Sequence, residues 1–395
     1  MLASEDKVEL MLENLIPAER VTTPPNFRPA FEFDGETGTA TLPPVSGVEV
    51  PSFEDFLIEQ GFDPAQYEVV GNPRTSRWQK YDGDWLTSYR FNFRKRNGLG
   101  ADLPMLLQEA RKKVKVKALL NAQDKALVVL WSDLQVGKVD YRGNTQSLIE
   151  RIELMKIRLE ALIRREKPKQ VLFVDLGDTV EGFNNAADMV QLQSNDLSIM
   201  EQVDLATTFA YDVLKSIYRL VPDITYASVG SNHCQWRIGK QAVGKPTDDW
   251  GVFIGRQLAR LSKEANLNIR FIEPQPQDDT LAVDVFGDQF HILGVMHGHQ
   301  AGNRPEQVPD WWRKQSFGRQ PISDATTLVH GHWHHLRIQE MGSTHRGTSR
   351  FLIQAPTLDN GSNWYRRGSG EDSVPGLAVF ALEQGADYTG TVWKL

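Results

Sequence analysis

Histidine is concentrated in one short stretch of this chain, Thr327 to His335, with the sequence TLVHGHWHH. Four of the nine histidines fall within six residues there. The apolar pair Leu328-Val329 predicts a short buried strand, and Gly331 predicts the turn at its end. His332 and His334 are two residues apart, so in an extended segment both imidazoles leave on the same side. Because neutral imidazole is the commonest protein metal ligand, the spacing predicts half of a metal site, with a solvated or core-satisfied histidine cluster as the alternative.

Potential metal ligands also follow four other predicted strands. The segments at these strand ends are Ser132-Asp133-Leu134-Gln135, Asp175-Leu176-Gly177-Asp178-Thr179-Val180-Glu181, Gly230-Ser231-Asn232-His233-Cys234 and Met296-His297-Gly298-His299. In α/β sheets, functional groups collect just past the carboxyl ends of the strands. A mixed nitrogen and oxygen donor set suits Mn²⁺, Fe²⁺, Zn²⁺ or Ni²⁺ better than Mg²⁺ or Ca²⁺.

The order of these motifs, D-x-Q, G-D-x-x-E, N-H, H-G-H and G-H-x-H, resembles the calcineurin-like metallophosphoesterase superfamily. The resemblance covers residues from about 125 to 340 and extends toward 395. It implies an α/β fold, a four-layer α/β/β/α sandwich, with a centre for two divalent metal ions at one edge of the sheets. Mn²⁺ is a frequent activator in that family and is the expected metal.

The resemblance also implies a role for each motif residue. The first metal is expected on Asp133, Gln135, Asp178 and His334. The second is expected on Asp178, Asn232, His297 and His332, with Asp178 bridging the two. His233 is expected beside them as proton donor or phosphate contact, so that His233 and Asp178 are the expected catalytic residues. Two cations about 3.5–4 Å apart can clamp a phosphate, activate water and stabilise a leaving oxygen.

Three positions depart from the family pattern. Gln135 stands where His is usual, and its neutral amide is the weaker ligand. Glu181 replaces the second Asp of G-D-x-x-D. Ser231 and Cys234 flank Asn232-His233 where Gly and an acid are usual, which leaves His233 without its expected orienting partner. Gln235, Asp140 and Glu181 are the candidates to replace that partner.

Four residues are expected to contact the substrate: Lys138, His299, Arg304 and Arg366. Surface solvation is the alternative for Lys138. Arg304 precedes Trp311, Trp312, Arg313 and Lys314 in a segment expected to be a substrate-facing loop or, alternatively, a packed Trp pair. The segment from Trp364 to Gly370 has the same mixture of aromatic and basic residues, and the same two alternatives apply to it. His330 and His335 are expected to be structural, and nothing around Cys234 indicates an activated nucleophile.

Alternating strands and helices must position these groups. Strands are predicted at 126–131, 171–174, 224–229, 269–272, 281–286, 290–295, 328–329, 336–341, 349–354, 377–382 and 388–395, and helices at 145–165, 196–220 and 248–264. Buried strands separated by amphipathic helices predict an α/β core. We expect this metallophosphoesterase domain to span residues 121–395.

Residues 1–120 are expected to form an α+β extension that the resemblance does not cover. Predicted there are a helix at 4–16, a Pro-rich linker or arm at 22–47, a short helix opening at Ser52, a hairpin turning at Asp82-Gly83 and a basic helix at 103–117. Its first part, to Val69, is acidic, and its second part, from Arg74, is basic. Tyr89, Phe91 and Phe93 share one strand face and Arg90, Asn92 and Arg94 the other, which predicts either a base-stacking surface or a small sheet with a buried aromatic face.

Composition limits the classes of protein that remain. The chain has 395 residues, 40% hydrophobic and 24% charged, as in ordinary globular proteins. Its net charge of −7 argues against a globally basic nucleic-acid binder. No apolar run is long enough to cross a bilayer, and the first residues lack a signal-peptide pattern. The single cysteine, Cys234, fits a reducing cytoplasm, so we expect a cytoplasmic protein without a membrane partner, and a homodimer is allowed.

Three functions are compatible with this chemistry. The first is a DNA exonuclease or endonuclease, because Ser132-Asp133-Leu134-Gln135-Val136-Gly137 is similar to the first motif of the nuclease subunit of double-strand-break repair complexes and of phage-type DNA exonucleases. DNA is then both substrate and partner, and DNA repair the expected setting. The second is a phosphatase or phosphodiesterase acting on a small molecule, a nucleotide or a phosphoprotein. The third is a non-catalytic protein that keeps metals for stability.

Overall fold

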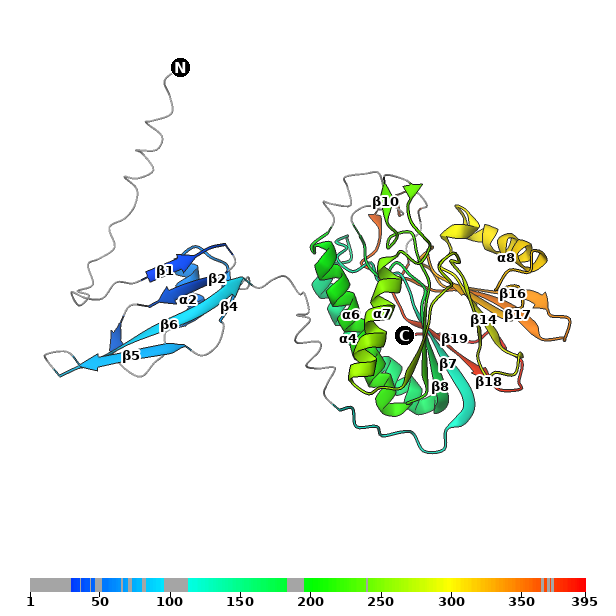
Figure 1. Cartoon of the computed structure of the whole chain (residues 1–395), viewed down its shortest axis with the longest axis horizontal. Coiled ribbons are helices and arrows are strands. Elements are labelled where there is room, and N and C mark those ends of the chain that lie inside the picture. The colour runs from blue at the N-terminus through cyan, green and yellow to red at the C-terminus, as the bar shows by residue number, and fades with distance from the viewer. Residues whose placement is uncertain are drawn as a thin grey trace, which may run out of the picture. The chain divides into compact units, whose positions relative to one another are not determined.

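The computed structural model consists of two compact units, residues 1–98 and 99–395 (Figure 1). It describes residues 30–35, 37–42, 44–46, 52–64, 67–69, 73–79, 83–95, 113–182, 195–238, 241–363, 366–367, 370 and 373–395. The division between the units comes earlier than the predicted limit at residue 120. Lys117 N donates to Arg219 O and Leu119 N to Leu220 O, at 2.8 and 3.1 Å, so this segment packs with the second unit.

The first unit is an antiparallel sheet with one short helix. Its strands are β1 (Ala30–Phe33), β2 (Thr37–Thr41), β3 (Val45–Ser46), β4 (Tyr67–Val69), β5 (Arg74–Gln79) and β6 (Trp85–Lys95), and its helix is α2 (Phe53–Glu59). The long strand β6 pairs with β2, β3, β4 and β5, so it organises the sheet. Ser52 caps α2 as predicted, accepting from Asp55 N at 3.2 Å. The predicted hairpin is confirmed as β5 and β6.

The aromatic face of β6 is buried. Tyr89, Phe91 and Phe93 are only 7, 4 and 2% exposed and pack against Phe53 and Leu57 of α2. Arg90, Asn92 and Arg94 alternate with them and are exposed. The predicted two-faced pattern is therefore confirmed, but its aromatic side forms a core and is not available to stack on bases.

Two predictions in this region are wrong in the part that the structure describes. The expected linker at 22–47 contains β1, β2 and β3, because Phe31 and Phe33 alternate with polar residues and stack on Phe93 at centroid distances of 5.5 and 5.7 Å. The expected basic helix at 103–117 is not helical over 113–117. The rest of that helix and the predicted helix at 4–16 lie outside the described residues.

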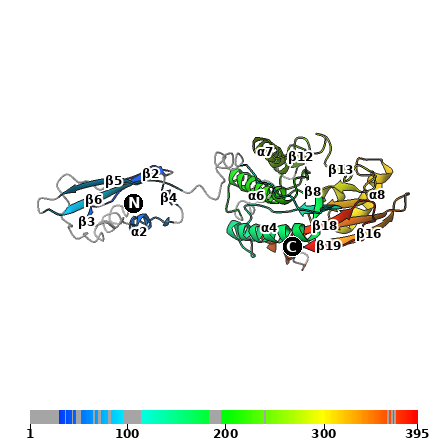
Figure 2. The same cartoon turned by 90° about the horizontal axis from the view of Figure 1, so that it is seen from below.

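The first sheet of the second unit is mostly parallel. Its strand order is β12-β9-β8-β7-β18-β19, with β7 (Gln123–Trp131), β8 (Pro168–Asp175), β9 (Ile224–Ser228) and β12 (Ile269–Ile272) parallel and β18 (Ala378–Glu383) and β19 (Val392–Lys394) antiparallel at one edge. Its helices are α4 (Thr145–Glu166), α6 (Ile199–Leu220) and α7 (Trp250–Glu264), which lie together on one side of the sheet in Figure 2. Asn144, Ser198 and Asp249 cap them.

The second sheet carries the histidine motifs. Its order is β13-β14-β15-β17-β16, with bounds β13 (Leu281–Asp284), β14 (Ile292–Val295), β15 (Thr327–His330), β16 (Arg337–Ser343) and β17 (Ser349–Gln354). Strands β14, β15 and β17 are parallel. The remaining elements are a two-stranded ribbon, β10 (Arg237–Ile238) with β11 (Gln241–Ala242), the 3-10 turns η2 (His299–Ala301) and η3 (Pro305–Gln307), and helix α8 (Val308–Phe317).

Alternate residues of the central strands enter different cores. Leu127, Val129 and Trp131 of β7 join the cluster that includes the helices, whereas Val128 joins one that also contains Val295 of the second sheet. A third cluster joins the second sheet to α8. Burial on both faces explains why the parallel strands are continuous apolar runs. The fold is therefore mixed α/β, as predicted.

The segment between the H-G-H and G-H-x-H motifs contains the turns η2 and η3 and the helix α8, where a substrate-facing loop or a packed Trp pair was predicted. Trp312 of α8 is 2% exposed, donates Nε1 to Ile322 O at 3.3 Å and carries Arg350 over its ring. The packed-Trp alternative is the one observed, because the apolar ring is buried in the third cluster.

Within the described part of the chain, no helix is both long and apolar enough to span a bilayer.

Candidate metal centre

The segments that follow the parallel strands are joined by backbone hydrogen bonds. Asp133 N donates to Gly177 O at 3.1 Å, and Gln135 N donates to Asp178 O at 2.9 Å. Gly331 N donates to His297 O at 2.8 Å. The predicted motifs after β7 and β8, and those after β14 and β15, are therefore neighbours, as expected for carboxyl ends that meet at one edge of a sheet.

Backbone strain is concentrated at the predicted ligands. Among the described residues ten non-glycine positions have positive φ, and five of them are Asp133, Gln135, Asp178, His332 and His334, with φ between 45° and 74°. Such conformations cost of order 1–3 kcal/mol each and persist only where the surroundings impose them. The clustering indicates a functional site rather than an ordinary set of turns.

Gly331 and Gly177 allow close approach of these segments. A Cβ at Gly331 would overlap the side chains of Ser132 and Asp133. One at Gly177, which has φ of +94°, would overlap the side chain of Ser231. The glycines of the two motifs therefore have a packing reason beyond the turns they make.

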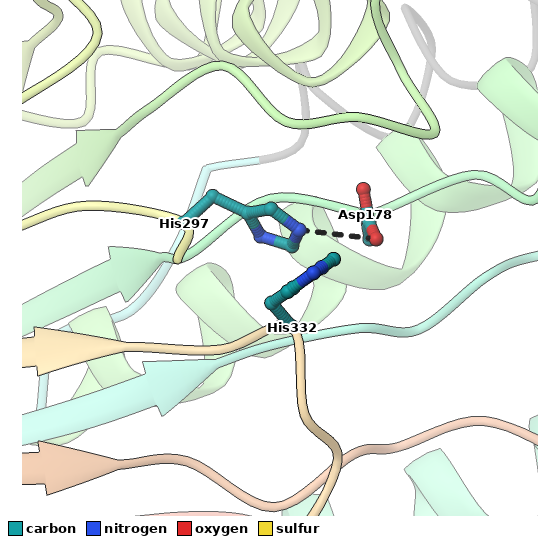
Figure 3. A group of neighbouring side chains, drawn as sticks. All are labelled: Asp178, His297 and His332. Carbon is teal, nitrogen blue, oxygen red and sulfur yellow. Dashed lines mark ion pairs between the residues drawn. The ribbon is translucent and has the colours of Figure 1, made fainter. Parts of the chain in front are cut away.

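The donor atoms of Asp178, His297 and His332 lie within 4.8 Å of one another (Figure 3). His297 Nε2 is 3.1 Å from Asp178 Oδ2 and 3.0 Å from Asn232 Oδ1. His297 Nδ1 is 2.7 Å from Leu176 O, so Nδ1–H donates a hydrogen bond to this backbone carbonyl and Nε2 faces the carboxylate. Asp178, Asn232, His297 and His332 are the four residues predicted for the second metal. Together they are called here the His297 half.

The His297 half fits a divalent cation. Asp178 is 1% exposed, and its Oδ2 is a buried oxygen without a well-oriented hydrogen bond. A buried carboxylate oxygen in that state is expected to face a cation. One carboxylate, one amide oxygen and two imidazoles form a donor set typical of Mn²⁺, Fe²⁺, Zn²⁺ or Ni²⁺.

The protonation of this half follows from its charges. Burial opposes ionisation of Asp178, but His297 and His233 outweigh it and hold the pKa of Asp178 well below its ordinary value. Burial also opposes protonation of His297, yet Asp178 raises the pKa of His297 to about 9. Burial and the charge of His297 lower the pKa of His332 to about 3. Without a metal, the Asp178 carboxylate is therefore balanced by a proton on His297.

The predicted ligands of the first metal are arranged differently. Asp133 Oδ1 lies 3.3 Å from His334 Nε2. The amide oxygen of Gln135 is 2.5 Å from Lys138 Nζ, and its Nε2 is 3.3 Å from His233 Nε2. Asp133, Gln135 and His334 form what we call the Gln135 half. In the described part of the chain, the one group of three or more His, Cys, Asp or Glu donors close enough to hold an ion is in the His297 half.

Lys138 is buried beside the Gln135 half. Its Nζ forms an ion pair of 2.6 Å with Asp359, and its side chain is 9% exposed. Burial opposes the charge, but Asp359 and Glu181 outweigh it and raise the pKa of Lys138. The surface-solvation alternative for Lys138 is therefore wrong, because the ammonium is held by a buried carboxylate.

Asp359 is a site residue that the motif analysis missed. It is fully buried, and its Oδ2 lies 2.6 Å from Lys138 Nζ and 3.4 Å from His334 Nδ1. Burial raises its pKa, but Lys138 and His334 outweigh this and hold the pKa well below the ordinary value. The available signal was a sixth strand end: Asp359 follows β17 in a D-N-G turn, where its Oδ1 accepts from Gly361 N at 2.9 Å.

His233 lies beside Asp178 and has an orienting partner. Its Nε2 is 3.9 Å from Asp178 Oδ2, and its Nδ1 is 3.0 Å from the backbone oxygen of Glu181 and 3.3 Å from Glu181 Oε2. Burial lowers the pKa of His233, but Asp178 and Glu181 outweigh it and raise the pKa to about 9. Of the three predicted replacements, Glu181 is the one observed.

The other predicted residues have separate positions. His299 lies 5.5 Å from His297 between ring centroids, and its Nε2 contacts Gln235 at 3.4 Å. Arg304 is exposed before η3, and Arg366 lies over the Tyr141 ring at 4.4 Å. His299 therefore lies beside His297 at the candidate centre. The contacts that the structure gives for Arg304 and Arg366 are with other residues.

The remaining residues have contacts consistent with the structural roles predicted for them. His330 and His335 contact backbone carbonyls, those of Gly331 and Trp333, at 3.0 and 2.8 Å. Cys234 is fully buried, and burial raises its pKa well above the ordinary value, as expected of an unreactive thiol.

No protein-family model matches this chain, and no match is found among curated proteins. The family resemblance therefore rests on the motifs themselves.

Proposed function

We propose that this chain is a metal-dependent phosphoesterase of the calcineurin-like type, a hydrolase that cleaves phosphodiester bonds, with DNA as its leading substrate. The observation that supports it most strongly is the convergence of Asp178, Asn232, His297 and His332 from four strand ends around a buried carboxylate oxygen. Backbone strain at the predicted ligand residues is typical of functional sites, and a cation could replace the ion pair of Asp178 with His297 by displacing the His297 proton.

The layer arrangement of that family is part of the proposal. Two sheets share one hydrophobic cluster, the first sheet shares a cluster with α4, α6 and α7, and the second shares one with α8. These contacts support an α/β/β/α sandwich. The two sheets would bring the Asp motifs of one and the His motifs of the other to a common edge.

In this proposal the centre takes two divalent cations, with Mn²⁺ as the first choice. Asp178, Asn232, His297 and His332 would hold one, and Asp133, Gln135, Asp178 and His334 the other. Bound divalent cations would supply Lewis-acid charge for the phosphate and lower the pKa of water.

In this proposal, side chains of the protein itself orient the metal ligands and transfer the proton. Glu181 holds His233 by Nδ1, so His233 Nε2 faces the carboxylate of Asp178. A protonated His233 at that position can stabilise charge on a phosphate oxygen or protonate the leaving oxygen. Asp359 holds His334 by Nδ1, an outer carboxylate of the kind that orients metal-binding imidazoles.

One observation favours the second candidate, a phosphatase or phosphodiesterase acting on a small molecule, nucleotide or phosphoprotein. The aromatic residues of β6 form the core of the first unit, so the base-stacking argument for DNA is lost. DNA remains the leading substrate because the first motif is similar to that of the nucleases.

The test is hydrolysis of end-labelled single-stranded and duplex linear DNA with Mn²⁺, alongside bis-p-nitrophenyl phosphate. Wild type and Asp178→Asn are compared. DNA degradation that the variant lacks supports the nuclease. Turnover of the small substrate with intact DNA moves the assignment to a small-molecule phosphodiesterase. Metal binding without turnover of either substrate contradicts the enzyme and leaves the non-catalytic alternative.

A further inference from the structure

The sheet of the first unit has a basic face opposite its aromatic core. Arg90 alternates with Tyr89 and Phe91 along β6, so it lies on the face away from these buried rings. Arg74 of β5 is directly opposite Arg90 in the antiparallel register, and both side chains are exposed. Residues directly opposite on one face have Cβ atoms about 4.5–5.5 Å apart, and like charges in such a pair are destabilising. This pair therefore does not add to the stability of the fold.

The register of the sheet places no acid in the row of this pair. From Arg90 the row continues across the neighbouring strands through Thr41 to Ala30. Glu32 of β1 lies in the next row of the same face, two strands away from β6. Among the residues that the structure describes, neither guanidinium of the pair has an ion pair or a hydrogen bond. Their two charges are therefore left to solvent or to a ligand.

The opposite side of the sheet carries exposed acids. Helix α2 packs on the aromatic face through Phe53 and Leu57 (Figure 2), and it exposes Asp55 and Glu59. The charge on α2 is therefore opposite in sign to that of the two arginines. In a protein of net charge −7, a face on which two arginines stand together is a local reversal of sign.

Neutral hydrogen-bonding side chains extend this face along the strands. Ser76 of β5, two residues from Arg74, is exposed on one side of the pair, and Asn92 of β6, two residues from Arg90, is exposed on the other. Their rows are four residues apart along β6, which is about 13 Å at the rise of a strand. Arginine, serine and asparagine side chains are among those that contact the phosphates and sugars of nucleic acids. A face of that length suits a polymer of phosphates better than one phosphate group.

We propose that the face formed by Arg74, Ser76, Arg90 and Asn92, called here the arginine face, binds the sugar-phosphate backbone of DNA. Each guanidinium would donate to phosphate oxygens, and the anion would relieve the repulsion between the two arginines. Backbone contacts carry no base sequence, so binding is expected to be independent of sequence. This contact would hold DNA for the proposed nuclease, and the choice of DNA rests on that proposed function. The binding itself needs neither a metal ion nor hydrolysis.

The test is fluorescence anisotropy of labelled single-stranded and duplex DNA titrated with the full chain in EDTA, which prevents metal-dependent binding and cleavage. We expect binding whose affinity falls as salt is raised. Arg74→Gln and Arg90→Gln keep most of the side-chain length and remove the charge. Each should weaken binding about tenfold and reduce the slope of log affinity against log salt by about one.

A stability measurement separates DNA binding from a role in the fold. Because the two arginines repel each other, neither substitution should lower the urea midpoint of the DNA-free protein. A lower midpoint in both variants would show that the arginines stabilise the sheet, and it would overturn the proposal.

Arg77→Gln is the matched control for general electrostatics. It removes an exposed arginine from the same strand, but from the other face, where the guanidinium lies 4.9 Å from the centroid of the Trp85 ring. DNA binding should be nearly unchanged in this variant. The proposal is overturned if DNA does not bind in EDTA, if the double variant Arg74→Gln with Arg90→Gln binds as wild type does, or if Arg77→Gln weakens binding equally. Binding of anionic phospholipid vesicles without binding of DNA would also overturn it.

Addition of Mn²⁺ distinguishes failure of this proposal from failure of the proposed function. DNA binding that depends on the two arginines, without hydrolysis of DNA or of the small substrate, would support the arginine face and contradict the enzyme. Hydrolysis of DNA, together with binding that is insensitive to the two arginines, would support the enzyme and overturn the arginine face.

Discussion

The His297 half and the Gln135 half of the candidate metal centre are built from the same kinds of residue, yet they are organised differently. In the His297 half, three donors lie within 4.8 Å around a carboxylate oxygen that has no well-oriented hydrogen bond. In the Gln135 half, a lysine ammonium already contacts Gln135 and Asp359. The difference teaches that the charge of the His297 half is balanced by a proton that a cation can displace, whereas the Gln135 half is partly compensated by a lysine side chain held in place.

The largest effect is expected for Asp178→Asn, because Asp178 is the proposed bridging ligand of both metal ions. Phosphoester hydrolysis should fall by at least roughly 10³-fold, since metal-assisted stabilisation is worth several kcal/mol. Initial rates on DNA and on bis-p-nitrophenyl phosphate measure it. Asp310→Asn, an exposed carboxylate on α8, is the matched control. Wild-type rates in Asp178→Asn would mean that the centre is not the site of the reaction.

Removing one imidazole from each half tests the comparison directly. His332→Ala should weaken the tightest metal binding by more than about 100-fold, beyond the usual effect of an outer-shell change. His334→Ala should leave that tightest event nearly intact, because His334 belongs to the other half. Titration with Mn²⁺ and elemental analysis after gel filtration measure both. Equal losses in the two variants would contradict the proposed division.

Asp359→Asn should affect stability and metal binding together. It leaves the Lys138 ammonium buried without its carboxylate, which costs about 3–5 kcal/mol of unfolding free energy. It also removes the partner of His334 Nδ1, so affinity or activity should fall roughly 10–100-fold. Urea unfolding of metal-free protein measures the first effect. The double variant Lys138→Met with Asp359→Asn should recover part of the stability, and no recovery would show that the ion pair is not the cause.

Metal affinity should depend on pH through the His297 half. The pKa of His297 is raised to about 9, so a metal must displace its proton at any lower pH. The apparent dissociation constant should fall about tenfold per pH unit between 6 and 9 and level off above. In metal-free protein the same pair with Asp178 stabilises folding fully below the ordinary pKa of 6.5, and this contribution is lost as pH rises through about 9. His332, with a pKa of about 3, carries no proton between pH 6 and 9, so it adds nothing to the pH dependence of metal affinity in that range.

The smallest effect is expected for Gln135→His. An imidazole would replace an amide whose oxygen is held by Lys138, and binding of a second cation should tighten by about tenfold or less. The second phase of a Mn²⁺ titration measures it. An unchanged titration would show that position 135 is not a ligand.

Most elements of the second unit could be predicted from the sequence. The apolar runs of β7, β8 and β9 and the three- and four-residue apolar spacing of α4 were strong local signals, and the structure has each within a few residues. Helix α8 was missed because its Trp and Arg residues resembled a binding loop and its buried stripe is short. The strands at 30–46 were not predicted because Pro and Gly residues interrupt this segment and its alternation of aromatic and polar residues is short.

The candidate site could be predicted in part, for a similar reason. Asp133 and Asp178 follow strands of one sheet, and His297 and His332 follow strands of the other, so parallel pairing was enough to bring each pair together. The meeting of the two pairs depends on how the two sheets pack. Asp359 comes five residues after β17, and nothing in its local sequence tied it to Lys138, 221 positions earlier. Its role depends on the turn that returns the chain to the sheet edge.

The sequence by itself determined which residues can do chemistry, because strand ends, glycine turns and donor types are local properties of the chain. Tertiary structure alone decided the protonation and pairing of those residues. Whether Lys138 faces water or Asp359, whether His297 carries a proton, and whether the β6 aromatics stack on a ligand or on Phe53 depend on burial and on charges brought from distant positions. Such interactions are set by distance in space and by exclusion of water, and neither is encoded in spacing along the chain.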